Sequence, residues 1–512
     1  MIQLETVVIS ANKNETNRLE APIVVHVMTP KLFENTNSVC LAQGLSFQPG
    51  LRVETNCQNC GFQQVRINGL DGPYTQILID SRPVFSALSG VYGLEQIPAS
   101  MIERVEVMRG GGSALFGSSA IAGTINIITK EPLRNSGQLS HTLTALGGGS
   151  SFDNNTSLNA SLVTDDHRAG LYIFGQNRYR SGYDYDGDGF TELPKLKNQT
   201  VGFRSYLKTS TYSKLTFEYH HMQEFRRGGD MLDRPPHEAH IAEQLQHSID
   251  GGSLKFDYFS PDEKNRLSIF ASAANTDRDS YYGPGNDPLK AYGKTTDLTA
   301  MGGAQYVHTF DKCFFMPSDL TAGLEYNRDR LKDNMWGYDR HTDQTVNIYS
   351  AFLQNEWKND RWGILIGGRL DKHNMVDNVI FSPRANLRFN PTQNINLRLS
   401  YSSGFRAPQA FDEDMHIENV GGTVAMIERA KNLKEEKSQS FSASADMYHR
   451  FGAFQVNFLV EGFYTRLLDV FVLENIGERD GILIKERRNG SGAKVLGLSM
   501  EGKMAYLSLF QL

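Results

Sequence analysis

Apolar and polar residues alternate over long stretches from about residue 138 to the end of the chain. Successive side chains of a β-strand point to opposite faces, so this period of two predicts strands with one apolar and one polar face. In residues 454–464, for example, one parity carries Phe454, Val456, Phe458 and Val460, and the other carries Gln455, Asn457 and Glu461. The clearest further strands are predicted at residues 156–163, 171–180, 201–207, 214–220, 253–259, 267–273, 351–357, 362–370, 383–389, 395–401 and 441–448.

Residues 1–130 follow a different pattern, in which short strands mix with helical and glycine-rich segments. Residues 32–46 are predicted to form a helix, and three consecutive glycines, 110–112, form a turn that tolerates any backbone angle. We therefore predict an α+β unit, followed by a polar hinge at residues 131–137. Its strands are predicted at residues 21–28, 51–54, 101–108 and 124–129.

Composition narrows the class of protein. A chain of 512 residues with net charge −6 would suggest about three soluble domains by length alone. However, its 29 Phe and 21 Tyr occur largely in short alternating segments, and no apolar run reaches the roughly 18 residues that a spanning helix needs. A negative mean hydropathy does not exclude a membrane protein, because each strand of a β-barrel turns only one face to lipid.

Residues 97–130 contain several short sequence motifs that together are highly specific. The segments ERVEV (103–107), RG (109–110), ALFG (114–117) and AGTINIITK (122–130) resemble the end of the plug domain of TonB-dependent outer-membrane receptors. Upstream, QILID (76–80) resembles the strand before the first apical loop of that family, although Ser81 stands where a glycine is usual. The glycines do not form a phosphate-binding loop, because the G-x-x-x-x-G-K-[ST] motif is absent from the sequence.

The resemblance implies an all-β transmembrane barrel with an N-terminal α+β plug domain inside its lumen. We expect a TonB-box-like segment at residues 1–11, the plug at 12–132 and the barrel at 133–512. Family members close with about 22 strands, and we count about 17 here. The barrel is therefore expected to be incomplete, with residues 506–512 as a strand broken off. Residues 1–10 lack the features of a signal peptide, which was either removed or lies upstream of a late gene start.

The β-branched run near the start of the chain could add as a strand to the open edge of another sheet. The alternative is that it is the first strand of the domain that follows. By resemblance it is the TonB box, which the energy-transducing protein TonB binds from the periplasm. The predicted TonB-binding residues are Glu5, Thr6, Val7, Val8, Ile9, Ser10 and Ala11.

Cys57 and Cys60 have the spacing of a redox pair, half a zinc site or a short disulfide. No βαβ pattern surrounds them, which disfavours thioredoxin-like chemistry, and no second Cys or His pair lies nearby in the sequence, which disfavours zinc. In an oxidising envelope compartment we predict a disulfide between them. Cys40 and Cys313 are left without a predicted partner.

Two regions contain candidate cargo-binding residues. In the family, plug loops like residues 71–74 and 81–96 face outward and touch cargo, although their aromatic residues could equally pack the plug against the barrel. The segment GFRAP (404–408) resembles a family motif that precedes an interval where haem receptors place a ligating histidine. The predicted cargo-binding residues are Tyr74, Phe85, Tyr92, Arg406 and His416.

The segment DYDGDGFTE (184–192) has the alternating aspartates and glycine of the front half of a calcium loop. The twelfth position is Lys195 and not Glu, so another loop must complete the site, or the segment is a solvated acidic turn. Cobalamin receptors of the family use aspartate-rich outer loops for calcium. We treat calcium as a possible ligand that the protein does not require, with Asp184, Asp186, Asp188 and Glu192 as candidate ligands.

The sequence contains no enzyme motif, neither a nucleophile elbow nor H-E-x-x-H. The resemblance implies active uptake of a scarce nutrient across the outer membrane of a Gram-negative cell, with cobalamin, haem or an iron–siderophore complex as cargo. The implied partners are TonB, the cargo, outer-membrane lipid and, as a candidate, a surface lipoprotein; nucleic acid is not expected. The alternative is a passive or structural barrel such as a porin or adhesin. A β-propeller enzyme would need a repeat of about 40–50 residues, which we do not find.

Overall fold

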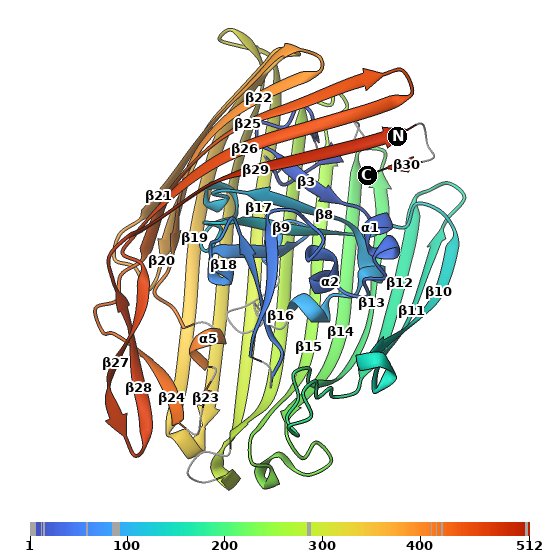
Figure 1. Ribbon diagram of the computed structural model, residues 1–512. Coiled ribbons are helices and arrows are strands. Elements are labelled where there is room, and N and C mark those ends of the chain that lie inside the picture. The colour runs from blue at the N-terminus through green and yellow to red at the C-terminus, as the bar shows by residue number, and fades with distance from the viewer. Residues whose placement is uncertain are drawn as a thin grey trace.

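A large curved sheet wraps around a smaller α+β unit in the computed structural model (Figure 1). The structure describes residues 7–11, 13, 16–57, 60–83, 93–283, 288–410, 412–415, 417–420, 423–506 and 510–511. The predicted site residues Glu5, Thr6, Phe85, Tyr92 and His416 lie outside these ranges.

The large sheet, which we call the wall, has 17 strands among the described residues, and consecutive neighbours pair antiparallel throughout. This agrees with the number expected from the alternating pattern. The strands in order are β10 (Ser136–Leu146), β11 (Ser151–Val163), β12 (Ala169–Arg180), β13 (Lys195–Ser210), β14 (Ser213–Gly229), β15 (Ala242–Phe259), β16 (Asn265–Gly283), β17 (Tyr292–Cys313), β18 (Met316–Met335), β19 (Arg340–Lys358), β20 (Trp362–His373), β21 (Ile380–Thr392), β22 (Ile395–Arg406), β25 (Glu436–Phe451), β26 (Phe454–Leu468), β29 (Ala493–Tyr506) and β30 (Phe510–Gln511).

The two faces of the wall are the reverse of those of a water-soluble protein. On β26, Phe454 and Phe458 are 42% and 41% exposed on the outside, whereas Asn457 and Glu461 are each 3% exposed on the inside. This confirms the predicted parity. An apolar outer face and a polar inner face suit a sheet surrounded by lipid.

The connections between wall strands differ at the two ends. One end has short turns such as residues 211–212 and 393–394, and the other has long connections such as residues 181–194, 407–435 and 469–492. In outer-membrane barrels the short turns face the periplasm and the long loops face outside. The last two long connections contain α5 (Asp412–Met415) and a separate sheet of β23 (Glu418–Val420), β24 (Thr423–Arg429), β28 (Ile482–Asn489) and β27 (Phe471–Arg479).

The α+β unit, which we call the plug, comprises the described residues from 16 to 130. Its main sheet has the strand order β3-β8-β9-β6-β7, and a separate hairpin pairs β4 with β5. The elements are β2 (Thr16–Asn17), β3 (Val25–Met28), α1 (Pro30–Asn35), α2 (Leu41–Leu45), β4 (Leu51–Cys57), β5 (Phe62–Ile67), β6 (Thr75–Ile79), β7 (Arg82–Pro83), α3 (Gly93–Gln96), β8 (Ile102–Arg109), α4 (Ser113–Phe116) and β9 (Gly123–Thr129).

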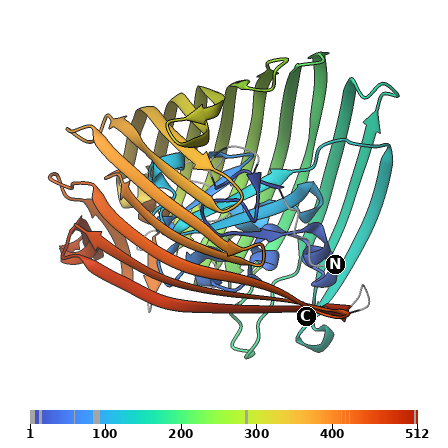
Figure 2. The same cartoon turned by 90° about the horizontal axis from the view of Figure 1, so that it is seen from above.

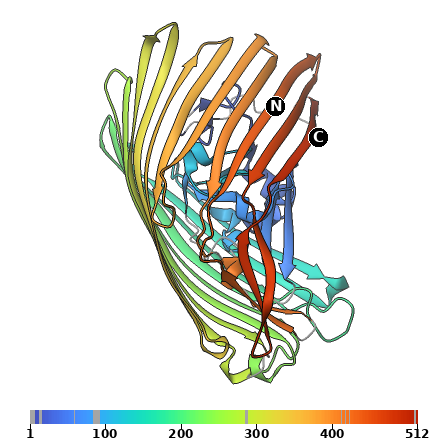
Figure 3. The ribbon, with the colours of Figure 1, turned by 90° about the vertical axis from the view of Figure 1, so that its left-hand side faces the viewer.

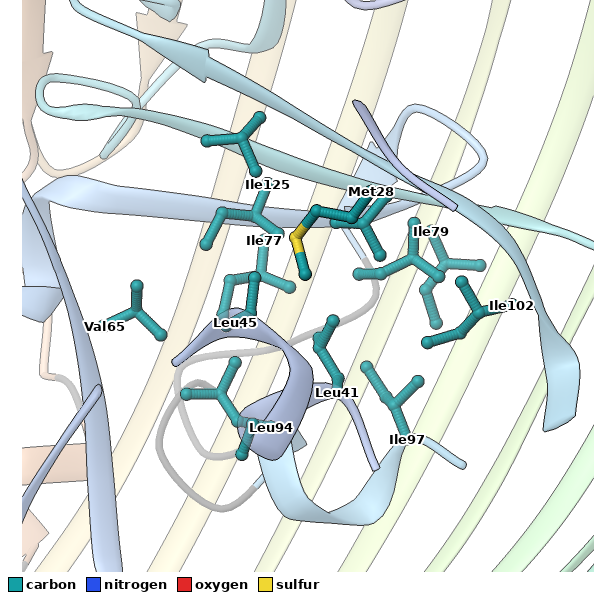
Figure 4. Close-up of a cluster of buried hydrophobic side chains, with 14 of the residues drawn as sticks. Met28, Leu41, Leu45, Val65, Ile77, Ile79, Leu94, Ile97, Ile102 and Ile125 are labelled. Atoms are coloured by element: carbon teal, nitrogen blue, oxygen red, sulfur yellow. The ribbon is translucent and has the colours of Figure 1, made fainter. Parts of the chain in front are cut away.

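Aliphatic side chains from the short helices and the main sheet form the core of the plug (Figure 4). Leu41 and Leu45 of α2 pack with Ile102 of β8 and Ile125 of β9, and all four are fully buried. Ser113 and Ala114 of α4 are small, and Gly117 after it takes a positive φ of 81°, which helps the chain to turn tightly between β8 and β9. This apolar core extends to the wall, where it includes Tyr172 and Phe174 of β12 and Leu467 of β26.

The plug lies within the curve of the wall (Figure 2), and the side view shows the same arrangement (Figure 3). The Tyr172 hydroxyl of β12 donates to the carbonyl oxygen of Ser100 at 2.6 Å. The Arg369 guanidinium of β20 donates to the carbonyl oxygen of Leu115 at 3.2 Å. Contacts with strands far apart in the wall show that the wall encloses the plug rather than lying beside it.

Several local predictions differ from the structure. The helix predicted at residues 32–46 is two helices, because Asn37 takes a positive φ of 51° and the Thr36 hydroxyl caps the carbonyl of Leu32 at 2.8 Å. The strand predicted at residues 21–28 is limited to Val25–Met28. Of residues 506–512 the structure describes 506 and 510–511, and these do not continue as one strand, because Phe510 pairs antiparallel with Tyr506. No helix within the described residues is long and apolar enough to cross a membrane.

Candidate functional site

A buried carboxylate of the plug binds the beginning of the chain. Glu106 on β8 accepts hydrogen bonds at its Oε2 from the backbone N–H of Ile9 (2.9 Å), the N–H of Ser10 (2.8 Å) and the hydroxyl of Ser10 (2.8 Å). Asn126 of β9 donates to the same hydroxyl at 3.0 Å. Glu106 and Ser10 are both fully buried. Three donors on one charged oxygen therefore fix residues 9–10 against the plug sheet.

The rest of the predicted TonB-binding segment is also held in place where the structure describes it. β1 (Val7–Val8) pairs antiparallel with β2. Val8 and Ala11 are fully buried in an apolar cluster with residues of the plug. The described part of this segment, residues 7–11, is therefore stowed in the protein and not extended into solvent.

Ion pairs join the plug to the middle part of the wall strands β26 and β29. Arg109 at the end of β8 lies 2.8 Å from Glu461 of β26 and 3.1 Å from Glu501 of β29. His26 of β3 contacts the same guanidinium through Nε2. Burial lowers the pKa of His26 to about 4, and the charge of Arg109 acts in the same direction. His26 is therefore neutral and accepts a hydrogen bond from Arg109.

A second ion-pair cluster surrounds Glu95 of the plug helix α3. Its carboxylate lies 3.3 Å from Arg178, 2.9 Å from Arg180 and 2.8 Å from Arg226, which come from β12 and β14. Burial alone would raise the pKa of Glu95, but the three guanidinium groups outweigh burial and hold the pKa well below its usual range. The plug thus offers one anion to three cations of the wall.

Two further clusters of ion pairs lie around the lumen. Glu325 of β18 accepts from Lys13 and from Arg369, at 2.6 Å each. Arg204 of β13 bridges Asp80 of the plug at 2.8 Å and Glu218 of the wall at 2.7 Å. We call these four clusters together the polar seam. A single buried ion pair adds little to the free energy of folding. The four clusters together, however, fix the position of the plug inside the wall.

Two of the predicted cargo-binding residues meet at the long-loop end. The Arg406 guanidinium lies 5.8 Å from the ring centre of Tyr74 and 5.4 Å from that of Phe471. The Tyr74 hydroxyl donates to Glu436 Oε1 at 2.9 Å, and Arg406 lies 3.6 Å from the other oxygen of Glu436. Tyr74 and Arg406 are 7% and 4% exposed. In this conformation they join plug to wall and do not face an open binding surface.

The acidic loop after β12 brings together the three predicted aspartates. Carboxylate oxygens of Asp184, Asp186 and Asp188 lie within 4.8 Å of one another. Glu192 is not in this group, because its carboxylate accepts from the backbone N–H of Tyr185. The aspartates also accept backbone N–H groups of the loop, such as that of Gly187 at 2.7 Å from Asp184. The loop could supply three of the six to eight oxygens that calcium prefers.

The predicted disulfide is wrong in this structure. No disulfide joins Cys57 to Cys60, nor do Cys40 and Cys313 form one. Instead the Cys57 thiol donates to Glu243 Oε2 of the wall at 3.1 Å, and the backbone N–H of Cys60 donates to the Cys57 sulfur at 3.4 Å. The fold thus gives Cys57 a partner that is 186 positions away in the sequence.

Sequence reasoning identified Glu461 as a lumen-facing residue but missed its ion pair, and it missed Glu106, Glu95 and Glu243 altogether. Glu95 lies in a plug helix, Glu106 in a plug strand and Glu243 outside the predicted strands, so only Glu461 carried the signal of a charged residue on the inward parity of a predicted wall strand. Such a pattern shows that a carboxylate faces the lumen, but not which plug residue it meets.

The family comparisons agree with this architecture. Residues 122–510 match the model of the TonB dependent receptor-like β-barrel, and residues 17–124 match that of the TonB-dependent receptor plug domain. The chain belongs to the TonB-dependent receptor family. This confirms the resemblance read from residues 97–130, and it places the protein in the outer membrane. The family is one of receptors and transporters and not of enzymes.

Among curated proteins, a vitamin B12 transporter (BtuB) of Vibrio vulnificus is 24% identical over 423 residues, which cover 80% of this chain and 64% of the relative. A vitamin B12 transporter of Vibrio cholerae is 31% identical over 126 residues, 25% of this chain and 21% of the relative. The chain thus spans less than two thirds of the length of these relatives.

Among solved structures, the siderophore receptor PirA of Acinetobacter baumannii has a TM-score of 0.78 at 18% identity, covering 94% of this chain and 78% of that one. A mutant of the ferric enterobactin receptor PfeA of Pseudomonas aeruginosa has a TM-score of 0.77 at 18% identity, covering 95% and 78%. At this identity the likeness establishes the fold of the receptor and not its cargo.

Proposed function

We propose that this receptor takes up a scarce nutrient actively, with energy delivered by TonB to residues 5–11. The cargo class is cobalamin, haem or an iron–siderophore complex, with cobalamin first because the curated relatives named above are vitamin B12 transporters. The long loops and the plug bind the cargo from outside, and the plug rearranges so that the cargo passes through the lumen.

The observation that carries this proposal is the stowed N-terminal segment. Val7 and Val8 are β-branched and form the short strand β1, and Val8, Ser10 and Ala11 are buried against the plug. A segment of this kind can exist in a stowed and a released state, and only the released state offers its backbone to the edge of another sheet. Cargo binding activates uptake if it favours the released state, which requires a higher affinity for that state.

The cargo contacts are proposed to involve Tyr74 and Arg406 after the plug rearranges. Both lie at the long-loop end of the wall, and Glu436 holds them together. A cargo that displaces the Tyr74–Glu436 hydrogen bond would weaken this contact between the plug and the wall. Cargo binding at the outer end would in this way be coupled to the position of the plug inside the wall.

The test is deletion of residues 5–11 in the full-length gene, followed by growth of the strain on each nutrient as sole source and by uptake of the labelled nutrient. We expect normal surface binding of one nutrient and loss of its uptake. A matched control substitutes exposed Arg52 of the plug hairpin. Unchanged uptake after the deletion would favour the passive class of barrel, such as a porin or adhesin.

We also propose that the acidic loop binds calcium through Asp184, Asp186 and Asp188, as an accessory to cargo binding. Support comes from the convergence of the three carboxylates on one exposed loop at the outer end of the wall. Glu192 would have to leave the Tyr185 N–H to take part. Calcium binding would order the loop by replacing water and backbone donors around the three carboxylates.

A further inference from the structure

Cys57 and Cys60 of the plug hairpin meet Glu243 of the wall, and all three side chains are of types that can bind a metal ion. Cys57 ends β4, Cys60 lies in the turn before β5, and Glu243 is the second residue of β15. In the wall, Glu243 stands between Gly228 of β14 and Tyr282 of β16. The group lies at the long-loop end, next to the Glu95 cluster, because Arg226 of that cluster donates to the carbonyl oxygen of Gly61 at 3.4 Å.

The ligand atoms converge closely. The Sγ atoms of Cys57 and Cys60 and a carboxylate oxygen of Glu243 all lie within 4.8 Å of one another, and Cys57 Sγ is 3.1 Å from Glu243 Oε2. Around a tetrahedral zinc ion, with Zn–S of about 2.3 Å and Zn–O of about 2.1 Å, ligand atoms are separated by roughly 3.5–3.8 Å. Shifts of about 1 Å or less would therefore place all three atoms on one ion.

The surroundings favour a bound ion over an ordinary polar contact. Cys60 is fully buried and Glu243 is 3% exposed, whereas Cys57 is half-buried. Cys60 belongs to an apolar cluster that includes Phe62 of the plug and Tyr282 of the wall. A dication would neutralise most of the charge of two thiolates and a carboxylate in this apolar surrounding. The exposed side of Cys57 leaves room for a fourth ligand.

The donor set indicates the class of metal. Thiolate ligands select zinc and other thiophilic ions, whereas calcium and magnesium require oxygen ligands throughout. Three protein ligands with one open position are typical of zinc sites that also bind an exchangeable molecule. We propose that Cys57, Cys60 and Glu243 form a site for a thiophilic divalent metal ion of the zinc class, which links the plug hairpin to β15.

Binding is a ligand exchange without a redox step. Each thiol loses its proton to solvent as its sulfur binds the ion, so two protons leave per ion, and Glu243 binds as the carboxylate. Because Cys57 and Cys60 belong to the plug and Glu243 to the wall, the bound ion is a cross-link between them. The proposal does not depend on which nutrient is taken up or on TonB.

The test uses the receptor purified in detergent, reduced, stripped of metal and titrated with Co²⁺ and then Zn²⁺. We expect one Co²⁺ per chain, with the absorption band of thiolate-to-cobalt charge transfer, and displacement of that band by Zn²⁺. The Cys57→Ser and Cys60→Ser variants should each lose the band. The Glu243→Gln variant should keep a weaker band and bind about tenfold or more weakly.

Controls separate this site from others and from misfolding. Cys313→Ser, at the far end of β17, should titrate like the unchanged receptor. Heat-modifiable migration on gels reports the fold of each variant, and Glu243→Gln tests the site if a cysteine variant does not fold. A band that is absent from the reduced receptor, or that persists in Cys57→Ser, would overturn the proposal. So would a Cys57–Cys60 disulfide found by mass spectrometry in receptor whose thiols were blocked before extraction.

Discussion

Removing the carboxylate of Glu106 should release the beginning of the chain. In the structure one oxygen of Glu106 accepts three hydrogen bonds from Ile9 and Ser10, at 2.8–2.9 Å. A hydrogen bond to a charged group contributes about 1.5–3 kcal/mol. Because the three donors share one oxygen, we take about 3 kcal/mol for the set, which is roughly a hundredfold in the stowed-to-released equilibrium.

Trypsin can measure this change, because Lys13, two residues after this segment, is protected in the stowed state. The Lys13 side chain is 7% exposed and pairs with Glu325 at 2.6 Å. When opening is fast relative to cleavage, the rate of cutting follows the population of the open state. We therefore expect Glu106→Ala to be cut after Lys13 about a hundred times faster, as read by intact mass. Glu106→Gln, which keeps one acceptor oxygen, should be cut at a rate between those of the unchanged receptor and of Glu106→Ala.

The matched control is Glu103→Gln, on the same strand but exposed. It should be cut at the rate of the unchanged receptor. If Glu106→Ala and Glu103→Gln were cut equally slowly while both remained folded, the carboxylate would not hold the segment. The proposed stowed and released states would then need another cause.

Three further predictions concern the seam and the loop. Arg109→Ala should lower the free energy of unfolding by about 3–5 kcal/mol, because it leaves two wall carboxylates buried without their cation, whereas exposed Arg52→Ala should change the melting temperature little. The pKa of His26 is lowered from 6.5 to about 4. The contribution of neutral His26 to the free energy of unfolding is therefore complete above pH 6.5 and is lost as the pH falls toward 4. The loss is at most about 3 kcal/mol. Melting profiles of the receptor and of His26→Gln that run parallel between these pH values would contradict this. Removing calcium with a chelator should weaken cargo binding, and Asp186→Asn should abolish that sensitivity; equal chelator sensitivity in the variant would refute the loop site.

The alternation of side chains was enough to predict the wall, because lipid outside and polar groups inside impose opposite requirements on the two faces. It predicted the strands too short, however. For β14 the sequence indicated residues 214–220, and the strand runs to Gly229. Its last residues, including Arg226, are buried on the inside by the plug, and the strand continues beyond the stretch where alternation is visible. Contact with protein on both sides removes the pattern on which the prediction relies.

The residues that join plug to wall could not be predicted in the same way. A period of two shows that Glu461 faces inward, but its partner Arg109 precedes it by several hundred positions. The same holds for Cys57, for which the sequence suggested its neighbour Cys60 and the fold provides Glu243. Local spacing favours local pairing, whereas an enclosed plug places distant segments in contact.

The polar seam also determines how a pulling force could move the plug out of its position inside the wall. An apolar interface must separate over its whole area before water can enter, so it resists a pull until it fails all at once. A seam of carboxylates and guanidinium groups can exchange each pair for hydration separately, since every ion finds an equivalent partner in water. The resistance to a pulling force would then be divided into small successive steps, and the wall could keep its shape while its contents are withdrawn.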